Sequence, residues 1–174
     1  VLKASEEGPA PLLAFARLVH EAGFPAGVVN VLTGFGPRCG AVLTSHPKVA
    51  HIAFTGGPDT ARHIVRGSAE NLASTSLELG GKSPFIVFED ADLESAANAQ
   101  VSGIFAASGQ SCVAGSRLVV AASVKEAFLA KLKAKAEAVI IGAPDNMATE
   151  VGPLCTAAQV ARAEDTIARS LAAG

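Results

Sequence analysis

The chain has 174 residues, of which 49% are hydrophobic and 17% charged, and its formal net charge is −2. This charge excludes the basic surface that nucleic acid or an anionic membrane requires, so neither is an expected partner. No apolar run approaches the ~18 residues of a membrane span. The sequence also contains no basic segment followed by an apolar segment, the pattern typical of a secretory leader.

Helices and strands alternate in the first half of the sequence. Apolar residues at helical spacing predict a helix over 9–22, with Pro9 near its start and Gly23 after its end. The next predicted elements are a buried strand over 28–32, a glycine loop over 34–40 leading into a short helix to 45, a strand over 49–55 and a helix over 58–66 stopped by Gly67. Connections this short predict a parallel sheet of βαβ units, and therefore an α/β fold.

The pair Gly80-Gly81 is the predicted domain boundary, which divides the chain into 1–79 and 80–174. Beyond it we expect a strand over 84–88, a helix capped by Asp92 and running to 107, a strand over 117–121, an amphipathic helix over 124–139 and a final helix over 156–173. The acidic run 89–94 coincides with a helix start, which favours capping over metal binding. We therefore expect no metal site.

The three cysteines are odd in number and widely spaced, and no CxxC pair or histidine cluster accompanies them. This pattern predicts free thiols in a reducing, cytoplasmic compartment rather than a disulfide framework or a zinc site. The high apolar content suggests faces that are covered by another subunit or by chain outside these residues. The opening Val1-Leu2-Lys3 reads as the middle of a strand, so we interpret the sequence as an internal piece.

Cys112 lies in the run Gly109-Gln-Ser-Cys-Val-Ala-Gly115, between a predicted helix and a predicted strand. Glycines let backbone approach a substrate closely, and a helix N-terminus at this point would favour the nucleophilic thiolate. The alternative is a buried structural cysteine, which is the commoner fate of a lone thiol.

Glu78 lies in Leu77-Glu-Leu-Gly-Gly-Lys-Ser-Pro84, at the end of an apolar strand. Desolvation among leucines would disfavour its charged form, which suits a general base. A hinge glutamate that pairs with lysine or caps backbone amides is the alternative.

Two glycine-rich turns could approach a phosphate. The loop from Gly34 to Gly40 is GxGxxxG rather than GxGxxG, and Pro37 removes one N–H donor, so a tight turn explains it as well. The run 54–58, Phe-Thr-Gly-Gly-Pro, is better placed, because its glycines separate a strand from a helix N-terminus, where a pyrophosphate binds. Lys3 and Glu6 follow the first strand, where they could hold a ribose diol or form a solvated pair.

In this order, the segments 3–6, 34–37, 54–57, 77–82 and 109–112 resemble the NAD(P)-dependent aldehyde dehydrogenase superfamily over almost the whole chain. The motifs around Glu78 and Cys112, 34 residues apart, are the most specific part. The resemblance implies an incomplete aldehyde dehydrogenase fold. Residues 1–79 would be the C-terminal part of a Rossmann-like NAD(P)-binding domain, and 80–174 the N-terminal part of an α/β catalytic domain.

The resemblance also implies roles for individual residues. Cys112 would attack the aldehyde to give a thiohemiacetal and, after hydride transfer to the nicotinamide, a thioester. Its backbone N–H would form half of an oxyanion hole, and Glu78 would activate the water that releases the carboxylic acid. The implied cofactor contacts are Lys3 and Glu6 at the adenosine ribose, Gly36 and Pro37 at the adenine, and Thr55, Gly56, Gly57 and Leu79 in the rest of the site.

Some family features are missing. Many members have serine where Gly57 stands, which leaves only backbone for the phosphate. The family's oxyanion asparagine lies upstream of these residues, and its second ribose-binding glutamate and oligomerisation segment lie downstream. We therefore expect the isolated chain to be inactive and the full protein to be a dimer or tetramer. NAD is favoured over NADP because Glu6 repels a 2′-phosphate.

Three alternatives stay open at this point. A CoA-acylating semialdehyde dehydrogenase has the same fold, but that branch generally lacks the glutamate that matches Glu78. A non-catalytic truncated relic with a binding or structural role fits an internal piece. An unrelated cysteine hydrolase would need a histidine partner for Cys112, and no sequence feature singles one out.

Overall fold

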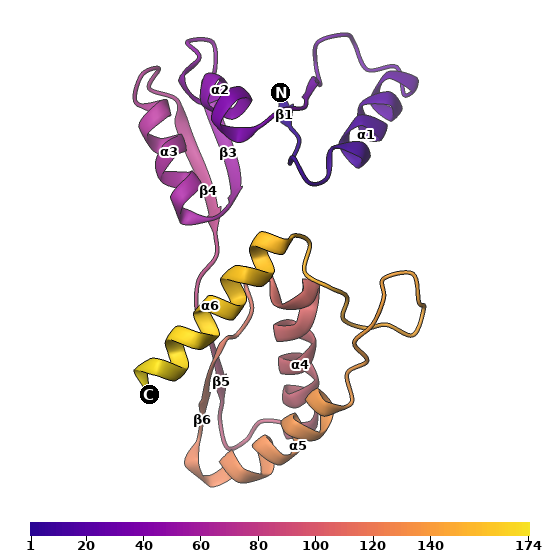
Figure 1. The fold of residues 1–174 in the computed structure, drawn as a ribbon, viewed down its shortest axis with the longest axis vertical. Helices are drawn as coiled ribbons and strands as arrows, with labels where there is room; N and C mark the ends of the chain where they lie inside the picture. Colours follow the sequence, from indigo (N-terminus) through magenta and orange to yellow (C-terminus); the bar gives the residue numbers. More distant parts are fainter. The chain divides into compact units, whose positions relative to one another are not determined.

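The structure, a computed structural model, describes residues 1–174 (Figure 1). Contacts divide it into two compact units, Val1–Leu79 and Gly80–Gly174. In both units, parallel strand pairs are joined through helices, which confirms the predicted α/β class and its parallel strands. No helix combines the length and the apolar character needed to cross a membrane.

The first unit contains two βαβ motifs. In chain order its elements are β1 (Leu2–Lys3), α1 (Pro9–Glu21), β2 (Val31–Leu32), the π-helical turn η1 (Gly36–Gly40), α2 (Ala41–Ser45), β3 (His51–Gly56), α3 (Pro58–Ser68) and β4 (Ser74–Leu79). Strands β1 and β2 pair in parallel across α1, and β3 and β4 pair in parallel across α3. The predicted strand over 28–32 is thus wrong in length, because only its last two residues find a partner strand.

The β3–β4 ladder has two different faces, since successive side chains of a strand point to opposite sides. The exposed face carries His51, Ala53, Thr55, Ser74, Ser76 and Glu78. His51 ties the two strands together on this face, with Ser74 Oγ 2.7 Å from its Nδ1 and Ser76 Oγ 3.3 Å from its Nε2. The alternate residues, including Phe54 and Leu77, are half-buried and belong to the face that α3 covers.

Two predicted boundaries in this unit are wrong. The glycine loop is helical from Gly36 to Gly40, and α3 continues through Gly67 to Ser68. Gly67 is a packing residue and no helix stop. A methyl group at this position would lie 2.4 Å from Oγ1 and 3.0 Å from Cβ of Thr44, a buried residue of α2.

We expect Gly67→Ala to lower the free energy of unfolding by about 1–3 kcal/mol, because the added methyl must displace the Thr44 side chain or part the two helices. Denaturant unfolding of the natural-length protein containing this chain measures the loss. Gly103→Ala is the matched control, since Gly103 is also helical but has no atom within 4 Å of an added methyl. The control should be neutral or stabilising by up to about 1 kcal/mol. Equal effects of the two substitutions would contradict this packing account.

The second unit is a third βαβ motif followed by two helices. Its elements are β5 (Pro84–Val87), α4 (Leu93–Gly109), β6 (Arg117–Val120), the short turn η2 (Ala122–Val124), α5 (Lys125–Glu137) and α6 (Ala157–Ala173). The predicted cap at Asp92 is confirmed, since its Oδ1 accepts from the Ser95 N–H at 2.8 Å. Thr156 caps α6 in the same way, and its Oγ1 accepts from the Gln159 N–H at 3.2 Å.

The core of this unit forms where β5, α4 and α5 meet. Val87, Ala97 and Phe128 are its fully buried members, and Leu132 packs against them, as the amphipathic pattern of α5 predicts. Two ion pairs on the surface, which share Glu94, add to the α4–α5 contact. Lys135 and Lys131 donate hydrogen bonds to Glu94 and lower the pKa of that carboxyl to about 2, so it remains ionised in acid that protonates an ordinary glutamate.

Candidate functional site

Strand pairing brings together three of the residues predicted to bind a cofactor. Lys3 is the last residue of β1, and the chain after β2 leads into Gly36 at the start of η1. Glu6 contacts both: its Oε1 accepts from the Gly36 backbone N–H and lies 3.4 Å from Lys3 Nζ. Pro37 follows within η1. A motif that spans 34 residues of sequence therefore forms one cluster in the first unit.

This cluster holds Glu6 as a carboxylate. Hydrogen bonds from its own backbone N–H and from that of Gly36 lower the pKa of Glu6, and the Lys3 ammonium lowers it further. Both contacts use Oε1, which leaves Oε2 to accept from an external donor such as a ribose hydroxyl. The alternative of a merely solvated loop pair does not account for the Gly36 contact.

A second group of predicted residues lies at the junction of β3 and α3. Gly56 ends the strand, and any side chain there would clash with the Phe54 ring, whose Cζ would lie 2.5 Å from an added Cβ. At Gly57 the surroundings are open, with nothing within 4 Å of an added Cβ, so the space that a serine would fill is empty. No side chain caps α3, so its first-turn N–H groups and the positive end of the helix dipole are available to an anion.

Thr55 and Glu78 are partners in the β3–β4 register, so these two predicted residues lie side by side on the exposed face of the ladder. The expected desolvation of Glu78 among leucines is wrong within this unit. Because side chains alternate along a strand, the neighbouring Leu77 belongs to the opposite face, and Glu78 is exposed. The polarity around a base at position 78 therefore depends on the groups that pack on the exposed face of the ladder.

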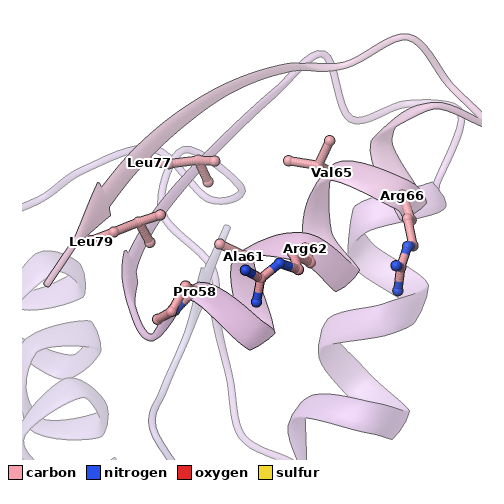
Figure 2. Close-up of a pocket in the computed structure, with 7 residues that line it drawn as sticks. All are labelled: Pro58, Ala61, Arg62, Val65, Arg66, Leu77 and Leu79. Carbon is pink, nitrogen blue, oxygen red and sulfur yellow. The ribbon is translucent and has the colours of Figure 1, made fainter. Parts of the chain in front are cut away.

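An open hollow of about 380 Å³ lies on the other side of β4, between the strand and α3. Figure 2 shows Leu77 and Leu79 of the strand and Val65 of the helix around it, with Arg62 and Arg66 at the helix surface. Sequence analysis missed this hollow, because it arises from the packing of α3 on β4 and no motif marks it. Of the predicted site residues only Leu79 lines it.

Cys112 is exposed and lies in a turn between α4 and β6, in the second unit. Within these residues Cys112 is therefore not buried. The thiol is in a loop and not at a helix N-terminus, because it follows the C-terminal end of α4 and precedes a strand. Cys39 and Cys155 are free thiols as well, and no group of three or more metal-ligating side chains is close enough together to hold an ion.

Two further residues of α4 carry no sequence signal but make specific hydrogen bonds near this turn. Gln100, buried in α4, donates from Nε2 to the Gly115 carbonyl at 2.8 Å. Ser108 donates from Oγ to the Gly152 carbonyl at 2.9 Å. Both hydrogen bonds end on the backbone of distant loops, so no spacing or composition in the sequence could have indicated them.

Comparison with known proteins places these features in a family. The model of the aldehyde dehydrogenase family matches residues 1–174. The chain is 66% identical over 174 residues to (Z)-2-((N-methylformamido)methylene)-5-hydroxybutyrolactone dehydrogenase of Acinetobacter baylyi, covering 100% of this chain and 36% of that protein. It is 47% identical over 156 residues to hydroxyisobutyraldehyde dehydrogenase of Mycolicibacterium austroafricanum, covering 90% and 31% of the two chains.

The fold also matches solved structures. The NAD+ complex of aldehyde dehydrogenase from Bacillus cereus superimposes with a TM-score of 0.94 at 44% identity, over 99% of this chain and 35% of that one. The present residues thus span about a third of the length of the relatives they match. The three βαβ motifs are accordingly part of a larger fold, as the sequence predicted. The chain belongs to the aldehyde dehydrogenase family.

Proposed function

We propose that the protein carrying this chain oxidises an aldehyde to a carboxylic acid with NAD+, through a covalent bond to Cys112. The family match over every residue of the chain carries this proposal. The exposure of both Cys112 and Glu78 supports it, because a nucleophile and a base must be reachable by substrate and water. Residues 1–79 would contribute to the cofactor domain and 80–174 to the catalytic domain.

In this mechanism the Cys112 thiolate adds to the aldehyde carbon, and the resulting alkoxide is stabilised by the Cys112 backbone N–H. Lys3, Glu6 and Gly57 would help to hold NAD+, which would supply the acceptor for the hydride on that carbon, so that a thioester to Cys112 could form. Glu78 then takes a proton from water, whose oxygen attacks the thioester carbon. The carbonyl re-forms, the acid leaves, and the cysteine is restored.

The cluster around Glu6 suits the adenosine end of NAD. Its carboxylate is ionised and positioned by Gly36, and Lys3 adds a donor beside it. The uncapped start of α3 next to Gly57 suits the pyrophosphate. A carboxylate beside the ribose would repel a 2′-phosphate, so NAD is the preferred cofactor over NADP.

Removing the Glu6 charge should shift this preference. We expect Glu6→Gln to raise the ratio of kcat/KM for NADP to that for NAD by about tenfold, as the loss of roughly 1.4 kcal/mol of repulsion requires. Initial-rate kinetics with both cofactors measure the ratio. Glu7→Gln, which removes an exposed charge one residue further on, should leave it unchanged. An unaltered ratio in Glu6→Gln would remove Glu6 from the ribose site.

The overall activity is tested on the natural-length protein. Aldehyde-dependent formation of NADH is followed without and with CoA, beginning with small hydroxylated aldehydes such as hydroxyisobutyraldehyde, the substrate in the name of one relative. Carboxylic acid formed without CoA is the expected product. An absolute requirement for CoA would indicate the acylating branch instead, and no turnover of any aldehyde would favour a non-catalytic role.

We also propose that the full protein is a cytoplasmic homo-oligomer. Three free thiols suit a reducing compartment. Large apolar side chains are exposed on both units, including Phe15, Phe24, Val42, Phe88 and Ile167, and further chain or a second subunit would cover them.

A further inference from the structure

The backbone just before Cys112 has an uncommon conformation. Helix α4 leaves helical geometry at Ala106, which is extended (φ −52°, ψ 144°). Ala107 and Ser108 then lie in the left-handed region (φ 49° and 55°), and Gly109 follows at φ 78°. Glycine adopts this region freely, but for alanine and serine it costs on the order of 1–3 kcal/mol per residue. Such a turn persists only when surrounding contacts hold it.

The Ser108 side chain supplies such a contact. Its Oγ donates to the Gly152 carbonyl at 2.9 Å, with the Pro153 carbonyl at 3.4 Å. The accepting segment is itself fixed, because Ile141 and Val151 form a parallel bridge and the Gly142 N–H donates to the Val151 carbonyl at 3.1 Å. Ser108 thus ties the end of α4 to a braced loop 44 residues further on.

The other side of the Cys112 turn is held independently. Gln100, only 5% exposed, donates to the Gly115 carbonyl, and Ala114 beside it is buried. Gly115 also lies directly against β5, since an added Cβ would be 2.7 Å from the Phe85 Cβ. The exposed thiol at Cys112 therefore lies between two fixed points, Ser108 and Gly115.

We propose that Ser108 is a positioning residue for the nucleophile: its hydroxyl holds the left-handed turn in the one conformation that presents Cys112 for attack. This inference rests on the proposed function, in which Cys112 is the nucleophile. Glycine would suit the backbone at 108 better than serine, and the gain from serine is the hydroxyl that reaches Gly152. Holding a reacting atom in place is worth large factors in rate, since a displacement of about 1 Å can cost about a hundredfold.

The test compares Ser108→Ala, Ser108→Gly and Ser108→Thr in the natural-length enzyme. Loss of the hydroxyl in the alanine and glycine variants should lower kcat about ten- to a hundredfold and leave KM for NAD unchanged. Threonine keeps the donor and should restore part of kcat. The glycine variant discriminates between the two roles of Ser108. If Ser108 only carried backbone strain, glycine would relieve it and kcat would not fall; if the hydroxyl positions Cys112, kcat falls because glycine has no hydroxyl.

A second readout follows the thiol itself. Iodoacetamide alkylation across a pH series is quantified by mass spectrometry, with Cys39 and Cys155 as references in the same digest. Alkylation of Cys112 alone should slow in Ser108→Ala and Ser108→Gly. Ser170→Ala, which removes a comparable hydroxyl-to-carbonyl bond in α6, should change neither kcat nor Cys112 alkylation.

The outcomes separate the two proposals. If Cys112→Ser is inactive while Ser108→Ala and Ser108→Gly keep wild-type kcat and Cys112 alkylation, the role of Ser108 is overturned and the proposed function stands. If Cys112→Ser still oxidises aldehydes, the proposed function fails, and the role of Ser108 fails with it.

Discussion

Replacing Cys112 with alanine in the natural-length protein is expected to lower aldehyde-dependent NADH formation by at least about 10³-fold. Without a nucleophile no covalent adduct forms, and the hydride has no thiohemiacetal carbon from which to leave. Removal of the nucleophile in other covalent enzymes costs up to about 10⁶ in kcat, the remainder coming from binding and charge stabilisation. Initial rates at saturating NAD+ and aldehyde measure the loss.

The control is Cys155→Ala, which removes another exposed thiol of the same unit. Its rate should equal that of the wild type. Retention of more than about a tenth of the activity in Cys112→Ala would show that the reaction does not pass through this sulfur. An electrophilic aldehyde analogue should label Cys112 in the wild type, and labelling at position 112 should be lost in the variant.

Glu78→Gln is expected to separate the two halves of the reaction. The thiohemiacetal and the first hydride transfer need no base to activate water, so one equivalent of NADH should still form rapidly. Release of the acid requires that base, so steady-state turnover should fall about 10²- to 10⁴-fold. Stopped-flow absorbance would show a burst followed by a slow phase, and added hydroxylamine should speed the slow phase by attacking the thioester.

Glu70→Gln, an exposed glutamate just after α3, is the matched control and should show normal turnover. A Glu78→Gln enzyme whose burst and steady state decline together would assign Glu78 to cofactor binding or hydride transfer. An enzyme with no defect would leave another group to activate the water.

Local signals in the sequence predicted the helices well. The apolar spacing over 9–22 and the cap at Asp92 depend on residues within one or two turns, and the structure places both helices within a residue or two of the expected bounds. Tertiary contacts decided the failures. The sequence pattern predicts a helix end at Gly67, but a glycine is needed there because α3 packs closely against Thr44. Of the strand expected over 28–32, only two residues form a strand, because β1 pairs with only two residues.

The candidate site was predictable in part. The order of the motifs assigned Lys3, Glu6 and Gly36 to cofactor binding. The structure joins them through a hydrogen bond and an ion pair, which no single motif implies. Within the first unit Glu78 is exposed and not buried as expected, because a strand alternates its faces. The contacts of Gln100 and Ser108 could not be predicted from the sequence. Each side chain donates a hydrogen bond to a backbone carbonyl, and every residue has a backbone carbonyl, so the sequence does not mark the acceptor.

The bond from Ser108 to Gly152 also orders events during synthesis of the chain. A ribosome adds residues from the N-terminus, so Cys112 is synthesised before the acceptor carbonyls at 152 and 153 exist. Until then nothing compensates the left-handed turn at Ala107 and Ser108, and the nascent segment relaxes to ordinary backbone geometry. The proposed arrangement of the Cys112 thiol therefore forms only once the following loop has been made and has folded.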